Sequence, residues 1–128
     1  MKFGLLVACL SVLGNIAAAA CPPSPPPAST IDLQEGDQRV SADWLEKTLV
    51  GMKLRFDDGT EHYREDGSYR YTASTGETYD APHYQFYDSG FRCIDYPNNP
   101  RFDFYVVHDG KLVLINYQGG RFPGELMR

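Results

Sequence analysis

The sequence predicts a mainly β domain in which one short N-terminal helix precedes an antiparallel meander of about seven or eight short strands, closed as a small barrel or sandwich. Three observations support this fold class. Turn triplets that end in glycine recur at short intervals, runs rich in Tyr, Phe, Val and Thr lie between them, and a single helical pattern precedes them. The triplets are DDG at 57, EDG at 65, STG at 74, DSG at 88, HDG at 108 and QGG at 118.

The helical pattern is the segment SADWLEKTLVG, residues 41–51. Ser41 or Asp43 is suited to cap its N-terminus, Asp43 with Glu46 fits a capping box, and Gly51 is suited to end it. Four residues share one face at helical spacing, which predicts that this face packs on the sheet. They are Trp44, Leu45, Thr48 and Leu49.

The dipeptide Asp109-Gly110 predicts a two-residue hairpin turn of the primed type. This turn places His108 opposite Lys111 and pairs residues 102–108 with residues 111–117. Both faces of the hairpin are then apolar, so both must be covered. We expect the sheet core on one face and the short helix on the other. If the helix lies elsewhere, the second face is a surface for a partner or a ligand.

The dipeptide Asp66-Gly67 predicts a second two-residue turn, which sets Arg64 opposite Tyr69 as a cross-strand cation–π pair. An aromatic and polar face results, and it could contact a ligand at a barrel mouth or belong to an edge hairpin whose rings shield their neighbours. The candidate ligand or partner residues are His62, Arg64, Tyr69, Tyr71 and Tyr84, with Tyr63 beside them.

The N-terminal part predicts export. Residues 1–20 have a basic start, a short apolar run and a series of alanines, which are typical of a secretory signal peptide. Residues 21–40 form a Pro-rich tether and lead-in, and residues 41–128 form a single β domain. The expected location is therefore the periplasm, or a membrane surface reached through a lipid on Cys21.

Cys21 has two interpretations. A cysteine after small residues is the site of bacterial lipoprotein processing, and the Pro-rich stretch that follows would then hold the domain off its membrane. Alternatively, Cys21 forms a disulfide with Cys93, the one other cysteine left after cleavage. In the strand FRCIDY, alternation places Phe91 and Cys93 on one face and Arg92 with Ile94 on the other.

Composition and motifs restrict the chemistry. The net charge of −5 becomes −6 when Lys2 leaves with the signal peptide, which argues against nucleic acid and anionic membrane surfaces as partners. No short spacing of His or Cys predicts a metal site, and no motif predicts a cofactor or catalytic residues. Arg101 and Arg121, with Asp95 and Asp103 nearby, are expected to form ion pairs that lock the barrel end, or to bind an anionic ligand.

From the helix onward, the pattern "DGSYRY … YQFYDSGFRCIDYP … RFDFYVV" and the closing "GGRFP" resemble small exported bacterial domains of unknown function with a lipocalin-like sheet. The resemblance covers about residues 44–123 and implies no reaction, cofactor or catalytic residue.

Two functional hypotheses follow. The first is a non-enzymatic envelope protein that binds an envelope partner or a small ligand through its tyrosine-rich face. The alternative is a small periplasmic enzyme of the hydrolase type, which uses Asp95 or Cys93 together with a histidine.

Overall fold

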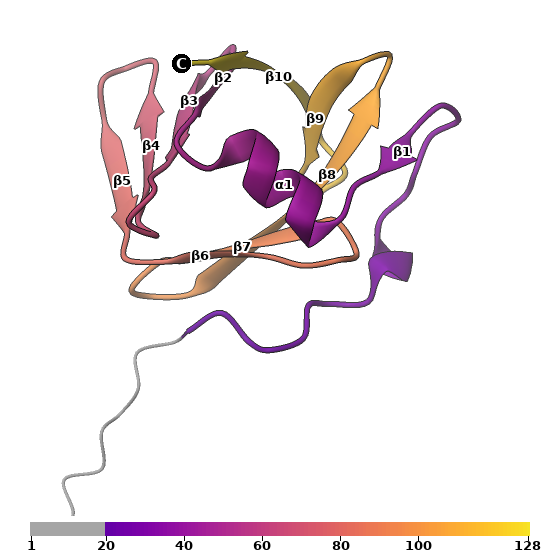
Figure 1. The fold of residues 1–128 in the computed structure, drawn as a ribbon, viewed down its shortest axis with the longest axis horizontal. Coiled ribbons are helices and arrows are strands. Elements are labelled where there is room, and N and C mark those ends of the chain that lie inside the picture. The colour runs from indigo at the N-terminus through magenta and orange to yellow at the C-terminus, as the bar shows by residue number, and fades with distance from the viewer. Residues whose placement is uncertain (1–19) are drawn as a thin grey trace, which may run out of the picture.

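The sheet of this protein curls into a half-barrel with one helix in its concavity (Figure 1). The structure is a computed structural model and describes residues 20–128, so the predicted signal peptide lies outside the described residues except for Ala20. Within residues 20–128 the mainly β class, the single α-helix and the antiparallel arrangement are confirmed, with ten strands rather than about seven or eight.

The chain order of the elements is simple. A 3-10 turn at Ala28–Thr30 and strand β1 (Gln38–Arg39) precede α1 (Ala42–Leu49). The remaining strands are β2 (Lys53–Phe56), β3 (Gly59–Tyr63), β4 (Tyr69–Ala73), β5 (Thr78–Ala81), β6 (Tyr84–Phe86), β7 (Phe91–Asp95), β8 (Pro100–His108), β9 (Lys111–Ile115) and β10 (Arg121–Met127).

The strand order across the sheet is β5-β4-β3-β2-β10-β9-β8-β7-β6, and β1 pairs with β8. The last strand, β10, is therefore the middle of the sheet. Its residues 121–124 pair with β9, and its residues 125–127 pair with β2. The change of partner falls at Gly124, where a Cβ would lie 2.6 Å from Leu54 Cδ1. Glycine at this position lets the two halves of the sheet approach at the bend.

The helix begins and ends close to the predicted residues. The Ser41 hydroxyl accepts a hydrogen bond from the Trp44 backbone N–H at 3.1 Å, and Gly51 has the positive φ of 80° that ends many helices. Leu45 and Leu49 are buried, as expected. The prediction that Trp44 shares their face is wrong, because Trp44 is 38% exposed.

Two apolar clusters lie on opposite faces of the sheet. The concave cluster combines Leu45 and Leu49 of α1 with inward residues of the strands, including Leu112 and Leu114. The convex cluster contains seven buried residues, Tyr87, Phe91, Cys93, Phe104, Val106, Val113 and Ile115. The 102–117 hairpin is therefore covered on both faces, as expected. The helix lies on the concave face together with the main core and does not cover a face of its own.

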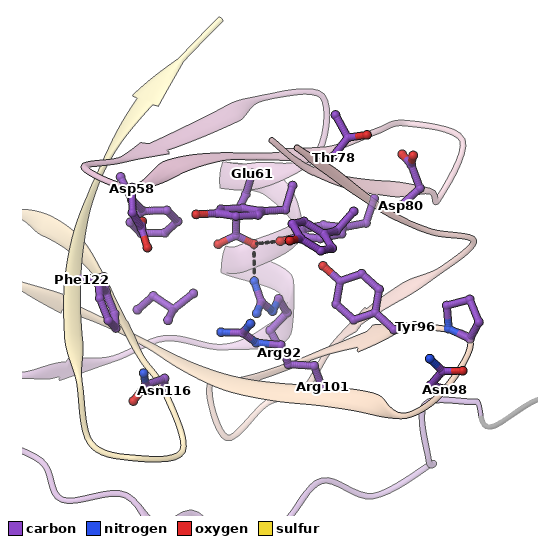
Figure 2. A pocket seen from close by; sticks show the side chains of 16 residues that line it. Asp58, Glu61, Thr78, Asp80, Arg92, Tyr96, Asn98, Arg101, Asn116 and Phe122 are labelled. Atoms are coloured by element: carbon purple, nitrogen blue, oxygen red, sulfur yellow. Dashed lines mark hydrogen bonds and ion pairs between the residues drawn. The ribbon is translucent and has the colours of Figure 1, made fainter. Parts of the chain in front are cut away.

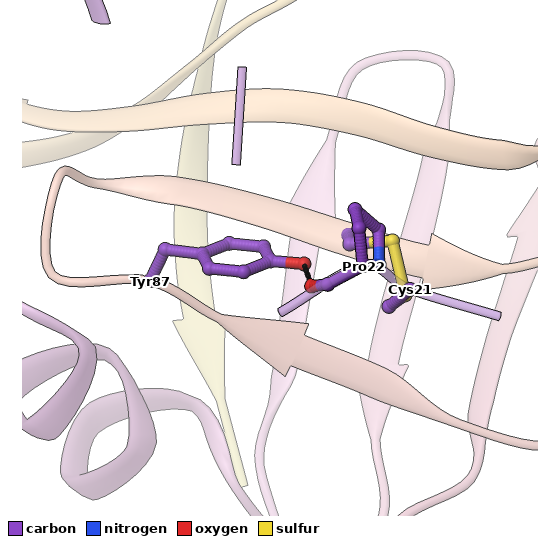
Figure 3. Close-up of a disulfide and its surroundings, with 4 residues drawn as sticks. Cys21, Pro22 and Tyr87 are labelled. Atoms are coloured by element: carbon purple, nitrogen blue, oxygen red, sulfur yellow. Dashed lines mark hydrogen bonds between the residues drawn. A yellow bond between two sulfur atoms is a disulfide. The ribbon is translucent and has the colours of Figure 1, made fainter. Parts of the chain in front are cut away.

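The convex face is covered by the segment that follows Cys21 rather than by the helix. Cys21 forms a disulfide with Cys93, and the Tyr87 hydroxyl donates a hydrogen bond to the Pro22 carbonyl at 2.6 Å (Figure 3). Ile31 and Leu33 pack on the same cluster. A lipid thioether on Cys21 would need the sulfur that this disulfide uses. The expectation that core and helix would cover separate faces is therefore wrong, since the sequence of the Pro-rich segment has no periodic pattern that predicts its packing on the sheet.

A buried carboxylate fixes the end of this segment. Asp37 accepts two hydrogen bonds from Arg121, at 2.6 and 2.9 Å, and one from the Gln34 backbone N–H at 2.8 Å. His108 Nδ1 lies 2.8 Å from the same carboxylate. Arg121 therefore forms an ion pair, as predicted, but its partner is Asp37 rather than Asp95 or Asp103.

One hairpin register is confirmed and the other is wrong. His108 pairs with Lys111 across Asp109 and Gly110, both of which have positive φ. In the other hairpin Tyr63 pairs with Tyr69 across a longer loop. There Gly67 has a positive φ, and the Asp66 carboxylate accepts hydrogen bonds from the backbone N–H and the hydroxyl of Ser68. The register therefore differs by one residue, which exchanges the two faces.

Candidate ligand-binding site

A buried carboxylate, Glu61 of β3, lies in the middle of the half-barrel. Its Oε2 accepts hydrogen bonds from the hydroxyls of Tyr63 and Tyr69, each at 2.7 Å, and its Oε1 accepts one from Tyr105 at 2.7 Å. The Tyr63 and Tyr105 oxygens are 2.8 Å apart. Three phenols from three strands thus converge on one carboxylate that is 2% exposed.

Arg92 of β7 supplies the positive charge that this carboxylate needs. Its Nη1 donates to Glu61 and, at 2.7 Å, to the Tyr63 hydroxyl, and its Nη2 donates to Asp103. Arg101 also donates to Asp103, from Nε at 2.8 Å. Two arginines therefore face two buried carboxylates, so the charges compensate each other within the protein. Buried charges are tolerated when they are paired in this way.

The guanidinium of Arg92 also lies 5.7 Å from the centroids of the Tyr69 and Tyr105 rings. The predicted cation–π pair between Arg64 and Tyr69 depended on the wrong register, and the cation over the Tyr69 ring is Arg92. Arg92 Nε is buried and has no hydrogen-bond partner within residues 20–128. This donor is the one buried side-chain polar atom of the described chain that the protein leaves unsatisfied.

Burial sets the protonation of the network. It raises the pKa of Tyr63, Tyr69 and Tyr105 well above the ordinary value, and the nearby Glu61 carboxylate raises each further. These phenols therefore stay protonated and remain hydrogen-bond donors at any physiological pH. Burial acts to lower the pKa of Arg92, but the Glu61 and Asp103 carboxylates raise it well above its usual range.

Strand alternation explains how these polar groups reach the interior. In β3 the inward positions are Gly59, Glu61 and Tyr63, and all three are buried. In β7 the pattern places Arg92 and Ile94 on the concave face and Phe91 with Cys93 on the convex face, as predicted. Asp103 is the direct cross-strand partner of Arg92, so the ion pair follows from the register of β7 and β8.

A cavity of about 770 Å³ opens above this network, at the end of the half-barrel opposite α1 (Figure 2). Figure 2 shows Glu61 and Arg92 meeting in its middle from opposite sides. Its aromatic lining consists of Phe56, Tyr69, Tyr71, Tyr79, Tyr96 and Phe122. The volume falls within the range of about 300–1,000 Å³ that is typical of small-molecule sites.

The polar lining combines donors and acceptors. It consists of Asp58, Thr78, Asp80, Asn98, Arg101 and Asn116. Asp80 is already held by Arg70, with Nε–Oδ1 at 2.7 Å, and Arg101 by Asp103. Burial raises the pKa of Tyr71 to about 12, with a further contribution from Asp58, so its phenol is also a donor here.

Tyr71 reaches the cavity because Gly59 leaves room for it. A Cβ on Gly59 would lie 2.3 Å from the Tyr71 hydroxyl oxygen and 2.7 Å from the Thr72 carbonyl oxygen. The Tyr71 side chain therefore lies directly over the start of β3. Its ring and that of Tyr79 on the neighbouring strand are 6.3 Å apart, and they form one wall at the cavity mouth.

The candidate residues from the sequence separate into two groups. Tyr69 and Tyr71 line the cavity. His62 lies on the opposite face of β3, beside Lys53 and Arg70, and Arg64 belongs to the hairpin loop. Tyr84 packs against Tyr63 with a centroid distance of 5.1 Å and donates to the Arg64 carbonyl. The structure therefore does not gather His62, Arg64 and Tyr84 with Tyr69 and Tyr71 around the cavity.

The groups considered for catalysis form no nucleophile–base or acid–base side-chain pair within residues 20–128. Cys93 is buried and its sulfur is in the disulfide, so it offers no thiolate. The Asp95 backbone N–H donates to the His83 carbonyl, and within residues 20–128 no histidine side chain hydrogen-bonds Asp95. Across the same residues, no group of three His, Cys, Asp or Glu side chains is close enough to hold a metal ion.

The sequence reasoning missed Glu61, Tyr96 and Tyr105 as site residues and assigned Arg92 no role, whereas the expected ion pair of Arg101 with Asp103 is present. A weak signal was available for Arg92, since this arginine lies within a mostly apolar strand. A charged residue on a buried strand face needs a partner of opposite charge. Nothing in the sequence of β3 distinguishes Glu61 from a solvent-exposed glutamate.

No helix in the described part of the chain is long and apolar enough to cross a membrane. Comparison of the sequence and the structure with protein-family models, with curated proteins and with solved structures gives no match. The observed architecture is therefore that of an antiparallel β half-barrel with a disulfide-bonded N-terminal segment, and no family is identified.

Proposed function

We propose that this protein is an exported, non-catalytic binding protein that holds a small molecule in the cavity at the open end of its half-barrel. The observation that carries the proposal is the cavity itself, which combines six aromatic rings with six polar side chains above a closed hydrogen-bond network. Concave sites with this mixture of lining groups are the usual binding sites for small molecules.

The network below the cavity supports binding rather than catalysis. Every carboxylate oxygen of Glu61 is engaged by a phenol or by Arg92, and Asp103 is engaged by two arginines. These hydrogen bonds and ion pairs hold both carboxylates in place and fix the floor of the cavity. A rigid floor reduces the loss of conformational freedom when a ligand binds.

The disulfide supports the proposed export. Disulfides persist in oxidising compartments such as the periplasm, and this one joins the first residue after the predicted cleavage point to strand β7 of the sheet. The proposal therefore places the mature protein outside the cytoplasm in its disulfide-bonded, unlipidated form.

The proposed function is tested by NMR titration of residues 21–128 with uncharged, cationic and anionic ring fragments. We expect fragment-induced shifts at Tyr71, Tyr79 and Tyr96, and a loss of affinity of about tenfold or more in Tyr96→Ala. The matched control is Tyr117→Ala, because Tyr117 is 80% exposed and does not line the cavity. Fragments that all fail to bind, or that bind equally well to Tyr96→Ala, would refute the proposal.

A further inference from the structure

We infer that the ligand of this cavity is an uncharged ring that carries several hydroxyl groups, in chemical terms a neutral pyranose-like sugar. This inference rests on the proposed function, because it names the ligand class for the same site. It depends on three properties of the lining, which are its charge balance, its mixture of donors and acceptors, and its aromatic walls.

The charge balance disfavours an anionic ligand. Arg92 and Arg101 are the cations of the lining, and both are neutralised by buried carboxylates of the protein. An added carboxylate or phosphate would have to compete with Asp103 for the same guanidinium groups. It would also approach the acidic groups at the mouth, Asp58 and Asp80. Moving an anion from water into such a site costs desolvation free energy. Within residues 20–128 the lining has no unpaired cation that could offset this cost.

The charge balance of the lining also disfavours a cationic ligand. Asp80 forms an ion pair with Arg70, with contacts of 2.7 and 3.1 Å. Asp58 is thus the one acidic group of the lining without an ion-pair partner in residues 20–128. It is exposed to solvent, and a single exposed carboxylate contributes little to the binding of a cation.

The polar lining matches hydroxyl groups. A hydroxyl donates one hydrogen bond and accepts up to two, so its binding site needs both acceptors and donors. Asp58 offers acceptor oxygens, and Asn98 and Asn116 offer amide groups from the other side of the cavity (Figure 2). The Asn116 Oδ1 already accepts from two backbone N–H groups, which leaves its amide N–H₂ for the cavity side.

The aromatic walls match the other surface of a sugar ring. The face of an aromatic ring is electronegative and attracts polarised C–H groups, which a pyranose presents on its flatter side. Tyr71 and Tyr79 provide such faces at the mouth, where Tyr79 is 48% exposed, and Phe122, which is 36% exposed, also lines the cavity. Exposed large aromatic side chains at a cavity mouth are typical of a surface that a ligand covers.

The test is an NMR titration of residues 21–128 with a charge-matched series of probes. The neutral probes are the methyl glycosides of glucose, galactose and mannose, and the charged probes are glucuronate and glucosamine. We expect at least one neutral glycoside to bind with a dissociation constant of about 1 mM, which is ordinary for a ligand of this size. We expect glucuronate to bind at least tenfold more weakly.

Variants at two adjacent residues distinguish a neutral ligand from a cation. Asp58→Asn removes the charge but keeps an acceptor oxygen, so the affinity for the neutral glycoside should change less than threefold. Asp58→Ala removes the acceptor and should weaken binding about tenfold. Asp57→Asn and Asp57→Ala are the matched controls, because Asp57 shares the β2–β3 turn but does not line the cavity.

Each alternative outcome has a distinct meaning. If ring fragments bind the cavity but none of the neutral glycosides does, the sugar assignment is wrong and the proposed binding function stands. The assignment is also wrong if glucuronate binds more tightly than the neutral glycosides, which would identify an anionic ligand. It is likewise wrong if glucosamine binds more tightly than they do and its affinity falls tenfold in Asp58→Asn, which would identify a cationic ligand. If no fragment and no glycoside binds, both the assignment and the proposed function fail.

Discussion

Arg92 and Asp103 face each other directly across β7 and β8, and their side chains form an ion pair in which both groups are almost completely shielded from solvent. Glu61 approaches the same guanidinium from the other half of the sheet. The two halves of the half-barrel are therefore joined in its interior by charge as well as by apolar contacts. The first prediction concerns the cation at the centre of this arrangement.

Replacement of Arg92 by methionine should lower the free energy of unfolding by about 3–5 kcal/mol, because Glu61 and Asp103 would remain buried without their cation. Urea denaturation monitored by circular dichroism measures this loss. Arg70→Met is the matched control, since Arg70 forms an exposed pair with Asp80 and its replacement should change the stability much less. Similar effects of the two substitutions would contradict a stabilising role for the network.

The second prediction concerns acid. Hydrogen bonds from Arg121 lower the pKa of Asp37 from 3.8 to about 2, against an opposing effect of burial. A lowered pKa means that the native state binds this proton more weakly than the unfolded state. The stabilisation from Asp37 is therefore complete above about pH 4 and is lost as the pH falls through about 2.

Asp37→Asn should accordingly be about 1–2 kcal/mol less stable than the wild type at pH 7, and the difference should shrink between pH 4 and pH 2. Urea denaturation at a series of pH values gives both quantities. Asp32→Asn, an exposed change in the same N-terminal segment, should show no such convergence. A pH-independent difference for Asp37→Asn would contradict the assigned ion pair.

The third prediction concerns the disulfide, which closes a loop with a sequence separation of 72. Its reduction should lower the free energy of unfolding by about 2–4 kcal/mol, because a long loop gains much conformational freedom in the unfolded chain. Thermal denaturation with and without dithiothreitol measures the change. The Cys21→Ser variant should match the reduced wild type and should not respond to dithiothreitol. A response in this variant would show that another effect of the reductant is responsible.

The fourth prediction concerns the bend in β10. Gly124→Ala should destabilise the protein by about 1–3 kcal/mol, because the new methyl group would overlap Leu54. A second substitution, Leu54→Ala, would leave room for the new methyl group. The double variant should therefore lose less stability than the sum of the losses in the two single variants. Additive effects in this double-mutant cycle would show that Gly124 acts through its backbone rather than through close packing.

Local sequence was sufficient for part of this fold. Asp109 and Gly110 both adopt positive φ, so the two-residue turn and the register of β8 and β9 follow from the dipeptide. The same reasoning failed at Asp66-Gly67, because Asp66 instead accepts hydrogen bonds from Ser68 and the loop is longer. Side-chain capping within a loop competes with the two-residue turn, and the sequence alone does not decide between them.

That single error had consequences for the candidate site. A register shift of one residue moved Tyr69 and Tyr71 from the face of His62 to the face of Glu61. The tyrosines were chosen for their chemistry and still line the cavity, whereas His62 was chosen through the wrong register and does not. Arg92 was placed on the correct face by alternation, but its partner Glu61 lies 31 residues away and is brought to it by the curl of the sheet.

The order of the strands has a mechanical consequence. Strands β5 and β6 form the two edges of the sheet, yet Pro82 and His83 are the whole connection between them. Two residues bridge no more than about 11 Å between the flanking Cα atoms. The short connection therefore ties the two edges of the sheet to each other at Ala81 and Tyr84, as a clasp closes a strap, and limits how far the sheet can uncurl there. Of the two edge strands, β5 contributes Thr78, Tyr79 and Asp80 to the cavity lining and β6 contributes none, so the clasp holds one cavity wall in place through β5.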